Sequence, residues 1–262
     1  MKVDLLLDTF GASWSEVREG ALAAEDAGFD GLWFFDHLSG AVHGEPHVLE
    51  CWTVLSAVAV LTRRVALGPL VLNMANRTPG VLAQMAATLQ QVSGGRLLVG
   101  LGAGSGPSSP YAVEDRALGH PLRPDPVRRQ HLRRYVADVR RFWSEEPGFL
   151  HPSPPPPIVI GALGPRMARL AGEIADGFNT FASLPDTAAP LIAAARAAAS
   201  GAAPARPDVL VTVLAPFATH WLDPEAPARQ RLSALAVDRL ILIVKPSNVA
   251  GFPCASTENP PR

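Results

Sequence analysis

The sequence has few of the residues that would tie a chain to metals, disulfides or polyanions. Cysteine occurs only at Cys51 and Cys254, with no metal or redox spacing, so we expect two reduced thiols in a cytoplasmic protein. Lysine occurs only at Lys2 and Lys245, and the 23 basic residues are balanced by 24 acidic ones. This balance argues against nucleic acid or an anionic membrane as a partner.

Long apolar runs are missing as well. No stretch reaches the roughly 18 apolar residues that a membrane span needs. The first apolar run, residues 3–8, is too short and too acidic for a signal peptide. Hydrophobic residues nevertheless make up 48% of the chain, so a full core can form without disulfides or metals.

The chain does contain a regular alternation of apolar runs and amphipathic stretches. The runs predict strands over residues 3–8, 31–36, 65–72, 97–102, 158–160, 177–181, 209–217 and 239–244. Helices are predicted over 13–27, 49–62, 78–93, 127–143, 165–176, 185–200 and from 223 onward. The strand runs are continuously apolar, as in parallel strands buried on both faces. Eight such units predict an α/β protein, a single-domain (β/α)8 TIM barrel, with a doubly wound sheet as the alternative.

Local signals place the helix starts and the irregular segments. Ser13 and Glu16 form a capping box, and the pairs Thr78-Pro79 and Asp223-Pro224 predict a capped start with proline in the first turn. The glycine-, proline- and serine-rich stretch 103–126 predicts a loop. We expect the barrel to cover residues 1–246, shortened at its C-terminal end, with an irregular proline-rich tail over 247–262.

In a barrel of this kind, the loops that follow the strands build the site. This rule selects Asp8, Asp36, His37, Asn73, Gly102, Ala103, Gly104, Ser105, Gly161, Ala162, Leu163, Gly164 and Lys245. Asp36 and His37 are the most chemical pair, since a histidine there could move a proton near neutral pH. A purely structural histidine, held by Asp36 or by a backbone carbonyl, is the alternative.

Two glycine-rich strand ends could admit a cofactor close to the backbone. Residues 100–106 resemble a phosphate loop but lack the GxGxxG spacing, so a Rossmann interpretation is weak. Residues 161–165 lead directly into a helix start, where free N–H groups favour an anion. A flexible loop and an ordinary tight turn are the respective structural alternatives.

Two other classes of site fit the sequence poorly. His43, His47 and Glu50 could suggest a metal, but Pro46 argues against a regular helix there, and no His-x-His closes the first strand. The serine-rich loop contains no nucleophile elbow. We therefore expect no metal centre and disfavour a hydrolase.

Several segments, in order and spacing, resemble the luciferase-like monooxygenase family, and most closely its branch that uses the deazaflavin F420. The resemblance rests on residues 31–37, 50–57, 62–68, 77–79, 85–89, 93–104, 160–166 and 175–179. It is strong over residues 1–180 and faint beyond.

The resemblance implies a (β/α)8 barrel that holds F420 or FMN in its mouth. By position, Asp36 and His37 would lie beside the redox ring, and Leu70-Val71 would form a bulge behind it that often contains a non-proline cis peptide. Asn73 and the two glycine-rich segments, Gly102-Ala103-Gly104 and Gly161-Ala162-Leu163-Gly164, would contact the cofactor and its phosphate. Arg77, Arg123 and Arg166 are candidates for holding the polyanionic F420 tail.

One departure from the family bears on catalysis. Ser105 stands where relatives often have tryptophan or a proton-donating glutamate, and serine cannot supply an acid near neutral pH. The first hypothesis is an F420-dependent oxidoreductase that transfers a hydride to or from a small organic substrate. The alternatives are an FMN-dependent monooxygenase using O2 and a non-catalytic cofactor-binding paralogue. A homodimer is a further expectation.

Overall fold

The structure, a computed structural model, describes residues 1–182, 185–202, 205 and 208–252. Its strands are β1 (Lys2–Leu7), β2 (Gly31–Phe34), β3 (Ala66–Pro69), β4 (Leu72–Asn73), β5 (Val99–Gly102), β6 (Ile158–Gly161), β7 (Gly177–Phe181), β8 (Leu210–Pro216) and β9 (Arg239–Val244). Its α-helices are α1 (Trp14–Asp26), α2 (Cys51–Leu61), α3 (Pro79–Val92), α4 (Ala112–Ala117), α5 (Asp125–Ser144), α6 (Pro165–Ile174), α7 (Pro185–Ser200) and α8 (Pro227–Ala234). Three 3-10 helices are η1 (Gly40–His43), η2 (Thr219–Trp221) and η3 (Pro246–Gly251).

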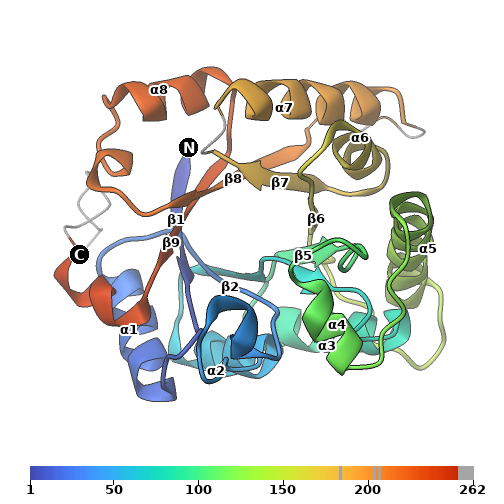
Figure 1. Ribbon diagram of the computed structural model, residues 1–262, viewed down its shortest axis with the longest axis horizontal. Helices are drawn as coiled ribbons and strands as arrows, with labels where there is room; N and C mark the ends of the chain where they lie inside the picture. Colours follow the sequence, from blue (N-terminus) through green and yellow to red (C-terminus); the bar gives the residue numbers. More distant parts are fainter. Residues whose placement is uncertain (183–184, 203–204, 206–207, 253–262) are drawn as a thin grey trace.

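All strand pairs are parallel, and the strands follow one another in the order β3-β2-β1-β9-β8-β7-β6-β5-β4. The two ends of this row, β3 and β4, both include residues of the single run predicted over 65–72, and β4 extends it to Asn73. A parallel bridge between Leu67 and Leu97 also joins β3 to the residues that lead into β5. The row therefore closes into the predicted (β/α)8 barrel, ringed by helices (Figure 1).

The third strand is interrupted at a cis peptide bond between Leu70 and Val71. The apolar run predicted one continuous strand here. In the structure it is divided into β3, which pairs with β2, and β4, which pairs with β5. The non-proline cis bond that the family resemblance implied is thus present at the expected residues.

Two layers of packing fill the barrel and its surroundings. A large cluster lies between strands and helices, and a smaller one contains Leu6, Trp33, Leu70, Leu214 and Ile241. Side chains alternate between the two faces of a strand. Leu6 and Ile241 of the smaller cluster therefore lie on the same faces of β1 and β9 as Asp4 and Arg239, two residues earlier. These faces form the barrel interior.

A buried ion pair fills the amino-terminal end of the interior. Arg239 donates two hydrogen bonds to Asp4, at 2.6 and 2.8 Å, and the indole N–H of Trp33 donates a third at 2.8 Å. These three residues stand on β9, β1 and β2. The polar layer closes one end of the barrel and leaves the carboxyl end for a ligand.

Of the three helix starts predicted from local sequence signals, the structure contains two. Ser13 and Glu16 form the capping box of α1. Pro79 begins α3, although the Thr78 side chain makes no capping hydrogen bond. The prediction at Asp223-Pro224 was wrong: these residues form a turn, and α8 begins at Pro227.

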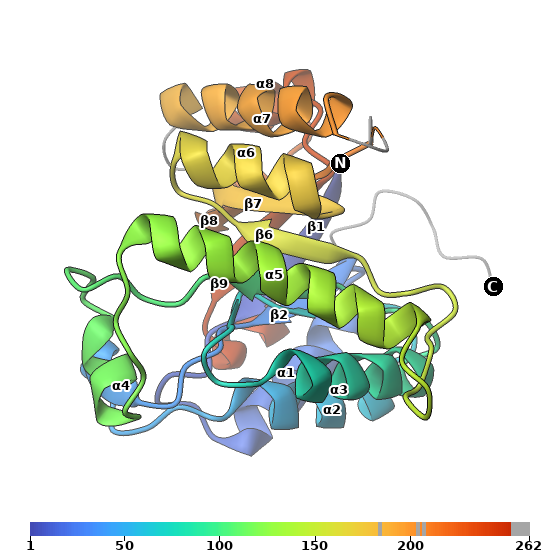
Figure 2. The same ribbon diagram turned by 90° about the vertical axis from the view of Figure 1, so that its right-hand side faces the viewer.

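Two segments have more regular structure than the sequence suggested. The stretch 103–126, predicted as a loop, contains α4, which Figure 2 shows at one end of the barrel, apart from the ring helices. Residues 246–251 form η3, which packs against α1, although the tail over 247–262 was expected to be irregular. Cys254 and the rest of 253–262 lie outside the described residues. No helix in the described ranges is long and apolar enough to cross a membrane.

Candidate active site

A cavity of about 1000 Å³ opens at the carboxyl ends of the strands. Its lining includes the twelve predicted residues Asp36, His37, Leu70, Val71, Asn73, Gly102, Ala103, Gly104, Gly161, Ala162, Leu163 and Gly164. They come from four stretches that are separate in sequence, over residues 36–37, 70–73, 102–104 and 161–164. The structure therefore brings all twelve residues to one place, and their part in binding stays a prediction.

The wall at the strand break is apolar and fixed by neighbouring glycines. A Cβ on Gly102 would lie 2.7 Å from a Val71 methyl group, and a Cβ on Gly161 would lie 3.2 Å from it. Only residues without a side chain at these two positions let Val71 pack against β5 and β6. Leu70, Val71 and Leu214 thus form a well-packed apolar patch on the cavity wall.

Gly104 is needed for the path of the backbone. Its φ of +72° lies in the left-handed region, and a Cβ there would come within 2.8 Å of the Asn73 side-chain oxygen. That oxygen also accepts a hydrogen bond from the Ala75 N–H at 3.0 Å. The glycine thus lets the loop after β5 approach the loop after β4.

His37 finds its partner in a residue that the sequence analysis did not select. Nδ1 of His37 lies 3.0 Å from Oε2 of Glu114, and the other carboxylate oxygen accepts the Leu38 N–H at 3.1 Å. Glu114 is only 7% exposed and comes from α4. The His37 ring also packs against Phe10 and Tyr111, with ring centroids 5.3 and 5.1 Å apart.

The Glu114 contact has a chemical consequence for His37. A carboxylate can only accept hydrogen bonds, so Nδ1 carries the hydrogen and Nε2 is left as the acceptor of the neutral ring. A carboxylate behind a histidine in this way orients the ring and fixes its tautomer. The two residues together can accept and return a proton at the cavity.

Asp36 is engaged elsewhere. Its buried carboxylate accepts hydrogen bonds from both terminal nitrogens of Arg77, at 2.9 and 3.0 Å, and from the Asn73 N–H at 2.8 Å. Arg77 also pairs with Glu50 at 2.6 Å. Asp36 therefore holds the loop after β4 in place, and the orienting role that the sequence analysis offered it toward His37 belongs to Glu114.

Several other candidates lie outside this cavity. Arg77 is committed to Asp36 and Glu50, so the structure does not offer it to a cofactor tail. Lys245 donates to the Phe10 carbonyl at 2.7 Å and pairs with Asp8 at 3.0 Å. Arg123 lines a second, adjoining cavity.

The residues first considered for a metal have structural contacts. His47 lies 3.2 Å from the Ala12 carbonyl oxygen, His43 packs on Phe10, and Glu50 caps α2 through the Trp52 and Thr53 N–H groups. Burial raises the pKa of Glu50, but the hydrogen bonds from Thr53 and Trp52, together with Arg77, outweigh burial and lower it. Across the described ranges, no group of three or more metal-binding side chains is gathered.

Positive charge gathers at one side of the cavity, near α6. Arg166 and Arg169 line it from α6, and Arg128 lines it from α5. No side chain caps the first turn of α6, whose N-cap residue is Gly164. Helix N–H groups and guanidinium groups both attract anions. This side of the cavity is therefore suited to a phosphate or carboxylate.

Ser105 and its surroundings are held by Asp115. The carboxylate accepts the Ser105 N–H at 3.2 Å and the Asn73 side-chain amide at 2.9 Å, and it lies 3.2 Å from Nδ1 of His120. Burial raises the pKa of Asp115, but the hydrogen bonds from His120, Asn73 and Ser105 outweigh burial and lower it. Asp115 thus ties the loop after β5 to α4 and to the loop after β4.

The fold and this cavity define a (β/α)8 barrel of the type that binds small ligands at the carboxyl ends of its strands. The model of the family described as luciferase-like monooxygenase matches residues 2–248, and the chain belongs to that family.

Curated relatives cover part of the chain. The F420-dependent glucose-6-phosphate dehydrogenase of Nakamurella multipartita is 35% identical over 181 residues, which are 63% of this chain and 52% of the relative. The 5,10-methylenetetrahydromethanopterin reductase of Archaeoglobus fulgidus is 32% identical over 168 residues, 62% of this chain and 48% of the relative. The chain spans about half the length of these relatives.

Solved structures share the fold. An F420-dependent secondary alcohol dehydrogenase in complex with an F420-acetone adduct matches with a TM-score of 0.76 at 19% identity, over 92% of each chain. This agreement independently supports the barrel.

Proposed function

We propose that this chain is an F420-dependent oxidoreductase that transfers a hydride between the deazaflavin and a small organic substrate. The observation that carries the proposal is the convergence of the predicted cofactor residues on one cavity, beside the His37–Glu114 pair. The names of the relatives, several of which are F420-dependent enzymes, support the same choice of cofactor.

The cavity fits a cofactor with a flat ring and an anionic tail. The patch of Leu70, Val71 and Leu214 offers an apolar surface for a ring system. The α6 N-terminus, with Arg166 and Arg169, offers donors for negative charge at another side of the same cavity. F420, when bound, would supply the two-electron hydride chemistry.

The chain itself supplies proton transfer and positioning. When the substrate is oxidised, Nε2 of His37 accepts the proton of its hydroxyl group as the carbon-bound hydrogen leaves as hydride; in the reduction, His37 returns the proton to the carbonyl oxygen. Glu114 keeps the ring oriented and in one tautomer throughout. His37, oriented by Glu114, thus supplies the acid that Ser105 cannot, which argues against a non-catalytic paralogue.

Binding and turnover test the proposal together. The purified chain is titrated with F420, F420H2 and FMN, with fluorescence as the readout, and is then assayed with alcohols, enones and quinones as substrates. We expect saturable binding of F420 at one site per chain and no comparable binding of FMN. Tight FMN binding with O2 consumption would favour the monooxygenase instead. No binding of any of the three at high micromolar concentration contradicts the enzyme assignment.

A homodimer and a cytoplasmic location stay predictions of the sequence. Light scattering of the purified chain measures the mass of the assembly and decides the first, and localisation of a tagged chain decides the second.

A further inference from the structure

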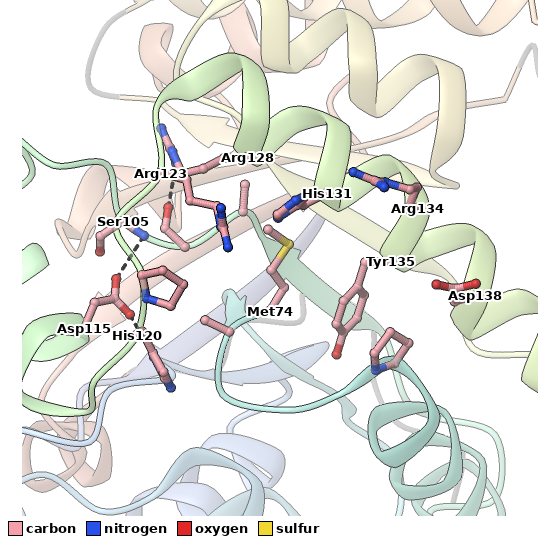
Figure 3. Close-up of a pocket in the computed structure, with 15 residues that line it drawn as sticks. Met74, Ser105, Asp115, His120, Arg123, Arg128, His131, Arg134, Tyr135 and Asp138 are labelled. Carbon is pink, nitrogen blue, oxygen red and sulfur yellow. Dashed lines mark hydrogen bonds and ion pairs between the residues drawn. The ribbon is translucent and has the colours of Figure 1, made fainter.

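A second cavity, of about 510 Å³, adjoins the first (Figure 3). It lies between the start of α3, the loop after β5 and α5. It shares five lining residues with the first cavity: Ala103, Gly104, Ser105, Asp115 and Arg128. The β5 loop is therefore a common wall, and a ligand in one cavity lies close to the other.

Basic side chains dominate this second cavity. Its lining includes Arg123, Arg128, Arg134, His120 and His131, with Asp115 and Asp138 as the acidic members. Figure 3 shows Arg123 and His131 reaching into the cavity beside Met74, while Asp138 lies beyond Tyr135 at the far end. The basic groups thus extend from Arg123 near the shared wall, past His131, to Arg134 on α5.

Some of these groups already have partners within the protein. Arg128 donates to the Gly104 carbonyl at 2.6 Å and pairs with Asp125. His120 pairs with Asp115, whose carboxylate is also occupied by Ser105 and Asn73. These contacts hold in place the wall that the two cavities share.

Three groups are left over. Among the residues that the structure describes, the side chains of Arg123, His131 and Arg134 make no hydrogen bond and no ion pair. The other arginines of α5 behave differently: Arg129, Arg133, Arg140 and Arg141 each pair with a carboxylate. Arg123 and Arg134 are thus unpaired guanidinium groups that line one cavity together with the imidazole of His131, and an anion bound there would accept charge-assisted hydrogen bonds from them.

We infer that the second cavity is an anion-binding site for a ligand group that carries carboxylates or a phosphate. The anion can come from two sources. One is the polyanionic tail of F420 bound in the first cavity, in which case the inference rests on the proposed function. The other is a separate anionic molecule that enters from solvent.

The test compares two double variants of equal charge. Arg123→Ala with Arg134→Ala removes two cations from the second cavity. Arg133→Ala with Arg141→Ala removes two cations from the same helix, outside both cavities, and is the matched control. Neither Arg123 nor Arg134 lines the first cavity, so the ring site is left intact.

Binding is measured by fluorescence for F420 with several glutamates in its tail and for F420 without them. It is measured by calorimetry for inorganic phosphate and glutarate on the chain without cofactor. If the tail is the ligand, the unaltered chain binds the longer cofactor about tenfold or more tightly than the shorter, as expected for one or two charge-assisted hydrogen bonds. The cavity variant loses this preference and the control variant keeps it.

If a separate anion is the ligand, both forms of F420 bind alike, and phosphate or glutarate binds the unaltered chain and the control but not the cavity variant. The inference is overturned if the cavity variant matches the control in both series. If no form of F420 binds at all, the proposed function fails, and the phosphate and glutarate series still decides whether the anion site exists.

Discussion

The contact between Glu114 and His37 determines which role each of the two residues has in the proposed mechanism. The carboxylate lies 3.0 Å from Nδ1 of His37 and is buried, so the two act as a unit. In the proposed mechanism, His37 moves the proton and Glu114 is a positioning residue that holds the ring in one tautomer.

His37→Ala is expected to lower turnover by roughly a hundredfold or more, as for the loss of a positioned acid or base. Glu114→Gln is expected to lower kcat by a smaller factor, with KM and F420 affinity little changed, and to alter the pH profile of kcat. Steady-state kinetics across pH and the melting temperature of each variant are the measurements. A Glu114→Gln enzyme with an unaltered pH profile and a lower melting temperature would leave Glu114 a structural role only.

The sequence could not have revealed Glu114. It lies nine residues after Ser105, where the family resemblance led us to look for an acid, in a stretch that its composition predicts to be a loop. The helix that carries it, α4, has six residues and no side-chain cap, so it lacks both periodicity and a start signal. Gly104 is the opposite case. The sequence pointed to this glycine, but the reason that glycine is needed there, its closeness to Asn73, is a tertiary contact that the sequence does not show.

At the level of elements, strands and ring helices were predictable because each repeats one pattern. The apolar run over 65–72 nevertheless hides a break, since Leu70 and Val71 continue the hydrophobic pattern that β3 begins. Likewise, Thr78-Pro79 and Asp223-Pro224 give the same start signal, and only the first begins a helix. Tertiary packing decides between such outcomes, which local sequence cannot distinguish.

The contribution of Asp115 to stability, made in the segment that connects β5 to α5, should depend on pH. Hydrogen bonds lower the pKa of this carboxyl below its usual value of 3.8 in the folded chain. Its stabilising contribution is therefore complete above the unfolded-state pKa and is lost as the pH falls through the folded-state pKa.

We expect Asp115→Asn to reduce the free energy of unfolding by about 1–2 kcal/mol near pH 6, because the carboxylate accepts several hydrogen bonds. The difference between the two chains should shrink toward zero as the pH falls below 3.8, the usual value for this carboxyl. Urea unfolding at a series of pH values measures it. A difference that stays constant across the series would contradict the assignment of these hydrogen bonds to the ionised carboxylate.

For the molecule as a whole, the barrel was predictable from the count and alternation of its units, and the two ends of its interior were not. Asp4 and Arg239 stand in mostly apolar runs, 235 residues apart in sequence. Nothing local indicates that they meet. Their pair, with the Trp33 indole, fills the amino-terminal end of the interior, which leaves the carboxyl end as the place for the cavity.

This pair should be important for stability and indifferent to ligand binding. Both side chains are buried, and removing one partner leaves the other charge in a medium of low polarity. Asp4→Asn is therefore expected to destabilise the chain by about 3–5 kcal/mol. Glu146→Gln, which breaks the exposed pair with Arg141, is the control, with an expected loss of about 0.5 kcal/mol or less.

Denaturant unfolding measures the free energy of unfolding of both variants. F420 titration of the folded fraction measures the affinity of the cavity for the cofactor. We expect the affinity of folded Asp4→Asn for F420 to equal that of the unaltered chain, because the pair and the cavity lie at opposite ends of the barrel. Replacing both partners, Asp4→Leu with Arg239→Met, should cost less than the single change, since no unpaired charge then remains in the interior. If Asp4→Asn unfolds as easily as the Glu146→Gln control, or if the double variant is the least stable of the three, the pair does not hold the closed end of the barrel as its geometry indicates.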